Sequence, residues 1–391
     1  MRGLKVLWPS QTAAAAAHFS MTSHEEPRLT AGGPHYYTLR PDSTIGGEVY
    51  ERALLERLPT HGIGLVLGLP RDHCVHDPPP HSQVDALRHR LGLHWARAPV
   101  VFTPYVVRLL RGRRVDLLRG HSVRHTGPAL LLGRALMRSR IPVVLHHHHL
   151  DPRWGRLEAA IAERADAVIT VSRHSRDQLV AAGVRPETVH VVLEGVARPA
   201  ATEGWPEAWP TSGLRLLYLG RLEERKRPRV AVEALAAVRR SHVAASLVMA
   251  GEGTLMETLV AHVGAMGIGD AVRFTGRVSD LDKWRLYDSA HLLLFPSTLE
   301  GFGLVVAEAQ SRGLPVIAAA GTATAEALDP DRSGFLVRPD GEAFAARVRE
   351  LTDDRRRRAM ASRARVFARR FDWDACAAGV AEVYKDLVRP R

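Results

Sequence analysis

The stretch PSTLEGFGLVVAEAQSRGLPVIA, from Pro296 to Ala318, decides how the second half of the chain folds. An apolar run, HLLLF at 291–295, precedes it and predicts a buried strand. The Gly-Phe-Gly turn then opens a helix over LVVAEAQSR, Gly313 ends that helix, and Pro315-Val-Ile-Ala begins the next strand. This order of strand, loop, helix and strand predicts one unit of a parallel α/β sheet.

Two carboxylates flank this turn, Glu300 before the helix and Glu308 one to two turns inside it, with seven residues between them. The turn glycines leave backbone N–H groups uncovered at the positive end of the helix dipole, where an anion is stabilised. Together these groups suit a ligand with hydroxyls at both ends and phosphates between. A helix-start acid and an exposed helix residue are the alternative, and the spacing alone does not decide between them.

A second loop, in LLYLGRLEERK at 216–226, places Arg221 and Lys226 five positions apart after another predicted strand. Two cations over a strand end suit a diphosphate, with Arg as a fork and Lys as a point charge. Because further arginines crowd this loop, a solvated basic turn is the alternative. AGEG at 250–253 and TGRV at 275–278 are two more glycine-bearing strand ends, and either could admit a nucleobase.

Short apolar runs alternate with helical stretches in both halves of the chain, which predicts two Rossmann-like α/β domains with a ligand cleft between them. The first strand is predicted at Tyr36–Leu39, and Gly46-Gly47 opens the first helix. The predicted organisation is a flexible extension at 1–34, an N-terminal domain at 35–196, a linker at 197–212, a C-terminal domain at 213–372 and a final helix at 373–391.

The charge is uneven: residues 1–200 hold 26 basic and 17 acidic side chains, and residues 101–150 hold nine basic and one acidic. This excess favours an anionic partner, such as a phosphorylated substrate, an acidic membrane surface or nucleic acid. Nucleic acid is disfavoured because almost all the charge is Arg, with no stripe of interleaved aromatics. A compositional bias toward Arg and Ala explains much of the excess equally well.

Membrane spans and disulfide frameworks are not indicated. No apolar run approaches the roughly 20 residues of a spanning helix. The two cysteines, Cys74 and Cys376, lie too far apart in the sequence for a metal motif or a disulfide framework. A cytoplasmic protein is predicted, and peripheral association with an anionic membrane stays open.

Taken in order, these segments resemble glycosyltransferase family 4, the retaining, nucleotide-sugar-dependent enzymes with the GT-B fold. The resemblance covers most of residues 36–388 and is strongest from Leu214 to Pro339. The segments that carry it are GRLEERK, VMAGEG, VRFTGRV, LLLFPSTLEGFGLVVAEAQSRGLPVIA and SGFLVRP, followed by FDWDACAAGVAEVY as a closing helix. TIGGEVYERALLERL and ADAVITVSRHSRDQLVAAGVRPETVHVVLEGV match the family's first half more loosely.

The resemblance implies a GT-B architecture with two Rossmann-like domains facing across a cleft, and a C-terminal helix packing back on the N-terminal domain. It implies retaining transfer from a UDP- or GDP-linked sugar, bound by the C-terminal domain, to a hydroxyl acceptor bound by the N-terminal domain. No metal and no further cofactor is expected. A sugar-nucleotide epimerase, a phosphorylase, or a non-catalytic nucleotide-sugar-binding protein on the same fold are the alternatives.

Residue roles follow from the same resemblance. Arg221 and Lys226 would bind the donor diphosphate. Glu300 would bind the donor sugar, Glu308 the ribose, and the loop at 275–278 the base. The catalytic residues expected are Glu300, Arg221, Lys226 and His148, and the donor-binding residues expected are Glu308, Phe302, Gly303, Leu304, Val278, Arg277, Gly46 and Gly47.

The run His146–His149 is the anomaly of the first half. Adjacent residues alternate faces, so the four imidazoles cannot converge on one metal ion. Family members often carry a His at the end of this strand, and His148 is the best match, with a register open by one or two positions. His121 and Arg124 would line the acceptor pocket, and Arg119 could serve an acceptor phosphate.

Two departures concern carboxylates. Where the family usually has Asn-Gly-Val, this chain has Glu194-Gly-Val, which adds an anion near the cleft. Asp372-Trp-Asp374 imitates the metal-binding pair of the other glycosyltransferase fold. Because it begins a helix far from the loops above, we interpret it as structural.

Overall fold

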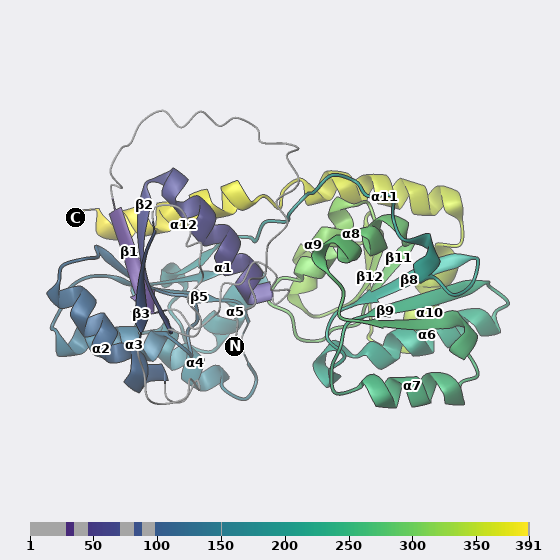
Figure 1. Ribbon diagram of the computed structural model, residues 1–391, viewed down its shortest axis with the longest axis horizontal. Coiled ribbons are helices and arrows are strands. Elements are labelled where there is room, and N and C mark those ends of the chain that lie inside the picture. Colours follow the sequence, from purple (N-terminus) through teal and green to yellow (C-terminus); the bar gives the residue numbers. More distant parts are fainter. Residues whose placement is uncertain (1–28, 35–45, 71–81, 88–97, 150, 390–391) are drawn as a thin grey trace, which may run out of the picture.

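A computed structural model describes residues 29–34, 46–70, 82–87, 98–149 and 151–389. They form two α/β domains, each built around one parallel sheet, which lie side by side (Figure 1). The two Rossmann-like domains predicted from the sequence are therefore confirmed. The strand predicted at Tyr36–Leu39 lies outside the described residues.

The N-terminal sheet has seven parallel strands in the order β3-β2-β1-β4-β5-β6-β7. Its central strands β4, β5 and β6 are buried along their whole length, as expected where helices cover both faces of a parallel sheet. The strands are β1 (Leu29–Pro34), β2 (Ile63–Pro70), β3 (Ser82–Leu87), β4 (Leu117–Gly120), β5 (Val143–His147), β6 (Ala167–Thr170) and β7 (Val189–Val191). The helices are α1 (Gly46–Arg57), α2 (Ala98–Arg111), α3 (Gly127–Leu136), α4 (Gly155–Ala162) and α5 (Arg173–Ala181).

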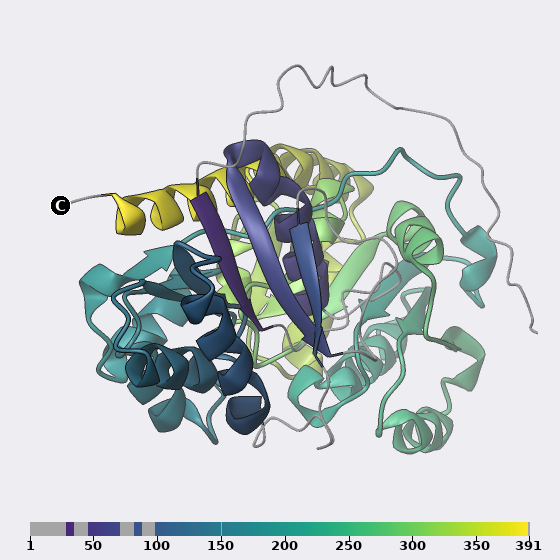
Figure 2. The ribbon, with the colours of Figure 1, turned by 60° about the vertical axis from the view of Figure 1, so that its left-hand side comes forward.

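Strand β1 corrects the predicted extension at 1–34. Leu29–Pro34 is an interior strand that pairs with β4 on one side and with β2 on the other, and Figure 2 shows β1 beside β2. Its sequence, LTAGGP, reads as a turn, but the glycines have a packing reason. A Cβ on Gly33 would lie 2.1 Å from the backbone oxygen of Arg119, and one on Gly32 would lie 2.5 Å from Val115. The N-terminal domain therefore begins before the predicted boundary.

The C-terminal sheet has six parallel strands in the order β10-β9-β8-β11-β12-β13. The strand order reverses between β8 and β11, which are neighbours, and ligands of open α/β sheets bind outside the carboxyl ends of the strands at this point. The strands are β8 (Leu214–Leu219), β9 (Ala245–Ala250), β10 (Val272–Gly276), β11 (Leu292–Phe295), β12 (Val316–Ala319) and β13 (Gly334–Val337). The helices are α6 (Pro228–Arg240), α7 (Met256–Ala265), α8 (Asp280–Ser289), α9 (Leu304–Ser311), α10 (Gly341–Glu350) and α11 (Asp354–Ala368).

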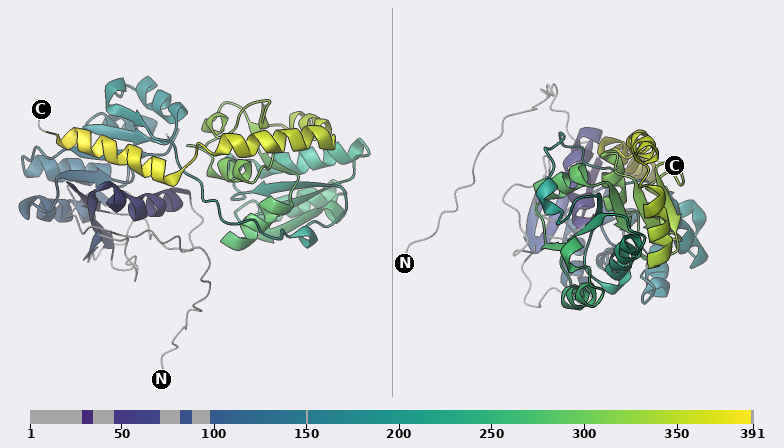
Figure 3. Two further views of the ribbon diagram at one scale, coloured as in Figure 1. Left: turned by 90° about the horizontal axis from the view of Figure 1, so that it is seen from above. Right: turned by 90° about the vertical axis from the view of Figure 1, so that its right-hand side faces the viewer.

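The chain crosses between the domains twice. Residues 197–212 make the first crossing, and Thr202 is held to the C-terminal domain by Asp288, which accepts bonds of 2.9 and 2.7 Å. After α11 the chain returns, and α12 (Trp373–Val388) packs on α1 of the N-terminal domain (Figure 3). Asp372 caps α12 by accepting from the Ala375 N–H. The expected return of the last helix is therefore confirmed, and Asp372 has the structural role expected of it.

Candidate active site

The loops after β8 and β11 meet where the strand order reverses. Lys226 Nζ lies 2.5 Å from Glu300 Oε1, and the side chains are 16% and 11% exposed. The Arg225 carbonyl accepts from the Thr298 N–H at 3.1 Å, which ties the two loops at the backbone. Neighbouring parallel strands end at the same edge of the sheet. The sheet topology therefore brings together two residues that are about 75 positions apart in the sequence. The predicted convergence of Lys226 and Glu300 is present.

The start of α9 lies beside this pair. Gly303 is the N-cap with φ of 98°, a left-handed conformation that favours glycine, and no side chain caps this helix end. The Phe302 side chain turns into the core, where its ring packs on Phe371 at 5.2 Å. Residues 302–304 can therefore offer backbone groups to a ligand, as expected, while the Phe302 ring has a structural role.

Glu308 lies further along α9 and is 8% exposed. Lys283 Nζ lies 2.9 Å from its Oε1, and the Tyr287 hydroxyl donates to its Oε2 at 3.0 Å. Both donors come from α8, which follows the loop containing Arg277 and Val278. Arg277 is exposed, and Val278 is half-buried against the core.

Arg221 does not join Lys226 in an ion pair with Glu300. Its guanidinium is 59% exposed and lies 2.8 Å from Glu223 Oε1 in the same loop, while Arg225 lies 3.4 Å from the other oxygen of Glu223. The loop thus presents one half-buried lysine and one solvent-exposed arginine. A diphosphate would have to draw Arg221 away from Glu223, which is a weak competitor because the pair is exposed.

The N-terminal domain brings His148 to this place from the end of β5. Its carbonyl accepts from Ser175 Oγ at 2.9 Å, and a Cβ on Gly301 would lie 2.0 Å from the same oxygen. Ser172 Oγ donates to the Gly301 carbonyl at 2.6 Å. The loop that carries Glu300 is therefore in direct contact with His148 and with the start of α5.

The His148 ring is held by two residues. Its Nδ1 lies 3.4 Å from Glu194 Oε1, and its ring contacts Tyr50 edge-on at 4.8 Å. Burial raises the pKa of Glu194, and His148 acts in the opposite direction. Glu194, the residue that stands where the family usually has Asn, is therefore the partner of the expected catalytic histidine.

Gly46 and Gly47 form the first turn of α1. A Cβ on Gly46 would lie 3.7 Å from Leu304 Cδ1, at the start of α9. The glycine turn of the N-terminal domain and the helix start of the C-terminal domain are thus neighbours. This placement agrees with the expected approach of Gly46 to a bound donor.

The other three histidines of the run diverge. His146 is buried between two tyrosines, with Nδ1 3.0 Å from the Tyr50 hydroxyl and Nε2 2.8 Å from the Tyr384 hydroxyl. His147 is buried 3.9 Å from Glu158, and burial lowers its pKa to about 3. Loss of solvation, together with His148 and Arg225, lowers the pKa of His149 to about 4, and Glu300 acts in the opposite direction, so His149 also lies near the Glu300 loop. The alternation of faces along the strand is as predicted.

The residues expected to bind the acceptor are engaged within the N-terminal domain. Arg119 is 1% exposed and binds both oxygens of Glu51 at 2.9 and 2.8 Å, so it is not available to an acceptor phosphate. Arg124 lies 3.3 Å from Asp151, and its guanidinium also approaches Glu158 at 3.7 Å. His121 is fully buried after β4. The prediction of an open pocket at these residues is wrong for Arg119, whose charge is used inside the fold.

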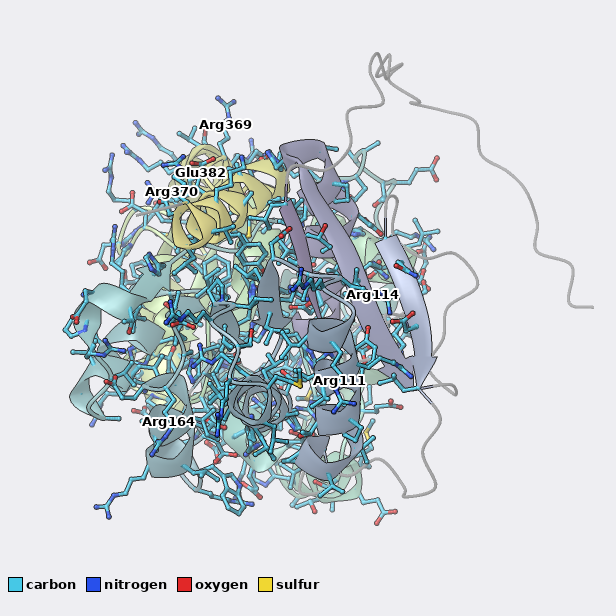
Figure 4. All side chains as sticks on the ribbon, turned by 90° about the vertical axis from the view of Figure 1, so that its left-hand side faces the viewer. Arg111, Arg114, Arg164, Arg369, Arg370 and Glu382 are labelled. Atoms are coloured by element: carbon cyan, nitrogen blue, oxygen red, sulfur yellow. The ribbon has the colours of Figure 1, made fainter. Side chains whose placement is uncertain are left out.

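Much of the basic excess of residues 101–150 lies away from these loops. Four exposed arginines lie at the end of α2 or after α2 and α3, where the chain returns to the amino ends of strands: Arg111, Arg113, Arg138 and Arg140. Figure 4 shows Arg111 beside α2 and Arg114 beside the edge strands of the sheet, where Arg114 pairs with Asp85 of β3 at 2.8 Å. A hollow of about 410 Å³ beside α11 is lined by Arg363, Phe367 and Arg370 among others, and none of the predicted site residues lines it.

Within the described part of the chain, no three His, Cys, Asp or Glu side chains are arranged to hold a metal ion. In the same residues no helix is long and apolar enough to span a bilayer.

Sequence reasoning missed the pair Lys283 and Tyr287, and the contacts of Ser172 and Ser175 with the Gly301 loop. A signal for the first was present in the composition, because lysine is rare in this chain. Glu194 carried a signal too, since its departure from the family's Asn was visible, although its partner was not.

The comparisons with known proteins agree with this geometry. The family model described as Glycosyltransferase Family 4 matches residues 45–198, and the one described as Glycosyl transferases group 1 matches residues 202–367. A glycogen synthase from Mycobacterium tuberculosis is 30% identical over 291 residues, which are 70% of this chain and 69% of that protein. A D-inositol 3-phosphate glycosyltransferase from Corynebacterium kroppenstedtii is 30% identical over 251 residues, 59% of this chain and 56% of its own length.

Solved structures show the same fold at lower identity. Sucrose-phosphate synthase from Thermosynechococcus elongatus superposes with a TM-score of 0.73 at 21% identity, covering 92% of this chain and 99% of that one. Anabaena HepE, solved in complex with UDP-glucose, superposes with a TM-score of 0.69 at 20% identity and covers 92% of this chain and all of its own. The chain therefore belongs to glycosyltransferase family 4, and it is a glycosyltransferase with the GT-B fold.

Proposed function

We propose that this protein transfers a sugar from a UDP- or GDP-linked donor to an acceptor hydroxyl, with retention of the anomeric configuration and without a metal ion. The observation that carries the proposal is the Lys226–Glu300 pair at the strand-order reversal, on a loop that contacts His148 of the other domain. The nucleotide sugar named in the HepE structure supports a UDP-type donor.

The chemistry follows from charge. When the nucleoside diphosphate departs, negative charge develops on its outer phosphate, and groups fixed beside it lower the barrier. Lys226, the uncapped start of α9 and the solvent-exposed guanidinium of Arg221 supply that positive potential without a metal. Glu300 accepts from donor-sugar hydroxyls once Lys226 turns to the phosphate.

Retention is proposed through departure and attack on one face of the sugar. Glu194, the other carboxylate near Glu300, has a side chain 5% exposed and is engaged by His148. It is therefore not placed to attack an anomeric carbon. His148 borders the sugar from the N-terminal domain, where the acceptor hydroxyl must arrive. The named relatives differ in their acceptors, so the acceptor class is left to experiment.

The test begins with wild-type protein, UDP- and GDP-sugars and a panel of hydroxyl acceptors in the presence of EDTA, with products read by mass spectrometry and NMR. We expect a new glycoside with the donor's anomeric configuration. Lys226→Met and Glu300→Gln should lower turnover by about 10²–10³-fold. Lys385→Met, in an exposed pair with Glu382 on α12, is the matched control and should not change it.

Three outcomes would contradict the proposal. Normal turnover in both site variants would remove the chemical role of the loop pair. An inverted product would exclude retention. Turnover that needs inorganic phosphate, or sugar conversion without an acceptor, would instead support a phosphorylase or an epimerase.

A further inference from the structure

Lysine is much rarer than arginine in this chain. Of its 54 basic residues only four are lysines, Lys5, Lys226, Lys283 and Lys385. Lys5 lies outside the described residues, and Lys385 is on the exposed face of α12. The other two, with side chains 16% and 15% exposed, are each paired with one of the two glutamates that flank the start of α9.

The second pair has a defined geometry. Lys283 Nζ lies 2.9 Å from Glu308 Oε1 and 3.1 Å from Asp280 Oδ1, and the Tyr287 hydroxyl donates to Glu308 Oε2 at 3.0 Å. The ammonium also lies 5.1 Å from the centre of the Trp284 ring. Each oxygen of the Glu308 carboxylate therefore has one donor from α8, which fixes the plane of the group.

The protonation of both donors supports this arrangement. Burial acts to lower the pKa of Lys283, but the carboxylates of Glu308 and Asp280 outweigh it and raise the pKa above its ordinary value. Burial, together with the charge of Glu308, raises the pKa of Tyr287. Lys283 is thus an ammonium and Tyr287 a neutral hydroxyl at neutral pH, so both remain donors.

One donor on each oxygen leaves acceptor capacity on both. A carboxylate oxygen can accept about two hydrogen bonds. A vicinal diol, with two neighbouring O–H donors, matches two such oxygens held in one plane. An arginine at position 283 would present a fork that engages both oxygens and competes with the diol, whereas the compact ammonium of Lys283 engages one.

We propose that Lys283 is a positioning residue for the donor, which holds Glu308 so that its free lone pairs accept the ribose 2′- and 3′-hydroxyls. The inference rests on the proposed function, because the ribose belongs to the nucleoside diphosphate. It assigns ribose recognition to a three-residue unit, Lys283, Tyr287 and Glu308, rather than to the glutamate alone.

The test measures discrimination between ribose and deoxyribose. Dissociation constants are determined by calorimetry for UDP and GDP and for their 2′-deoxy counterparts, with wild-type protein, Lys283→Met and Lys385→Met. In the wild type, loss of one hydrogen bond to a charged acceptor should weaken binding about 10-fold or more. In Lys283→Met we expect that ratio to fall to about 3-fold or less, through weaker binding of the ribose form. Lys385→Met, whose lysine makes a comparable i,i+3 pair at 3.2 Å on α12, should keep the wild-type ratio.

Kinetics give a second readout that a loss of stability would not produce. The ribose contact is the same in the ground state and the transition state, so Lys283→Met should raise KM for the nucleotide sugar and leave kcat nearly unchanged. Lys283→Arg keeps the charge but should also lose ribose discrimination, because its fork covers both oxygens. Thermal unfolding checks that each variant is folded, and Lys283→Gln replaces the methionine variant if the latter does not fold.

The outcomes separate the two proposals. If the wild type discriminates and Lys283→Met keeps the ratio, the role of Lys283 is refuted while nucleotide-sugar transfer stands. Tighter nucleotide binding by Lys283→Met would show that the lysine competes with the ribose and would also refute it. If neither UDP nor GDP binds the wild type, the proposed donor is wrong and the inference fails with it.

Discussion

The two domains use buried charge in opposite ways. In the C-terminal domain, Lys226 and Glu300 lie in loops that follow strands, Lys283 and Glu308 lie on helices α8 and α9, and all four are partly exposed or close to the surface. In the N-terminal domain, Arg119 and Glu51 are almost completely buried and bind each other inside the fold. Arg119 also lies beside a glycine at the end of β4, yet its charge is used inside the fold, so the difference teaches that a charge near a strand end binds a ligand only where the fold leaves it partly exposed.

The N-terminal cluster is an extended structural network. Arg119 Nε donates to the Tyr384 hydroxyl at 3.0 Å, and the same hydroxyl contacts His146 Nε2 at 2.8 Å. His146 in turn contacts Tyr50 of α1. The network joins α1, β4, β5 and α12, and it stands directly behind the strand end that presents His148.

The largest expected effect tests whether turnover requires contact between the Glu300 loop of the C-terminal domain and the N-terminal domain. Gly301→Ala would place a Cβ 2.0 Å from the His148 carbonyl oxygen, so the Glu300 loop and the N-terminal domain must separate. We expect turnover to fall by about 10²-fold, because a displacement of this size misaligns the reacting groups. Nucleotide binding, measured by calorimetry, should change only a few-fold. Gly264→Ala, where no atom lies within 4 Å of the added Cβ, is the control, and wild-type turnover in Gly301→Ala would show that the contact is not needed.

The next effect concerns stability rather than turnover. Arg119→Met removes the guanidinium that binds both oxygens of the buried Glu51 and should lower the free energy of unfolding by about 3–5 kcal/mol. Urea denaturation measures this loss, and the double variant Arg119→Met/Glu51→Leu should recover most of it. A single variant that is as stable as wild type but inactive would instead assign Arg119 to a ligand.

The smallest effect concerns His147. It tests whether this histidine is a buried, neutral residue of the fold, while His148 beside it lies at the candidate site. The folded-state pKa of His147, about 3, lies below the value of about 6.5 for an unfolded histidine. The unfolded state therefore binds the extra proton as the pH falls below about 6.5, and stability is lost toward pH 4 by at most about 1.4 kcal/mol per pH unit.

His147→Leu should make that loss shallower, as measured by denaturation at pH 7, 6 and 5. The nearby Glu158 has a pKa raised by burial, which opposes the histidine's effect, so the wild-type slope is the reference. His242→Asn replaces an exposed histidine and should leave the slope unchanged. Equal slopes in wild type and His147→Leu would mean that this histidine is not held neutral by burial.

The sequence predicted most of the C-terminal domain because its site loops follow apolar strands, with Gly220 before Arg221 and Gly301 after Glu300. The N-terminal domain was harder for identifiable reasons. The sequence of β1 resembles that of a turn because it contains two glycines. The close approach of the Arg119 backbone and of Val115 requires those glycines, and local propensity does not reveal such contacts. Arg119 looked like a phosphate ligand because its partner, Glu51, is 68 residues away in sequence.

The same limit applied to Lys283. Its pairing with Glu308 depends on how α8 packs against α9, and no local sequence pattern predicts that packing. Composition offered the only hint, because a chain that uses arginine almost everywhere has lysine at two half-buried positions. The contacts of His148 with Glu194 and Tyr50 could not be predicted from the histidine run, because these partners are distant in sequence.

The return of α12 to the N-terminal domain has a consequence for biosynthesis. The ribosome completes the N-terminal sheet long before it makes Trp373, Cys376 and Tyr384, which are buried against that domain. At about 5–20 residues per second the wait is on the order of ten seconds or more. During that time the nascent sheet exposes the apolar face that α12 later covers, and the Arg119 guanidinium does not yet have its contact with Tyr384. Release of a natively folded enzyme therefore depends on keeping that face from aggregation until the last helix arrives.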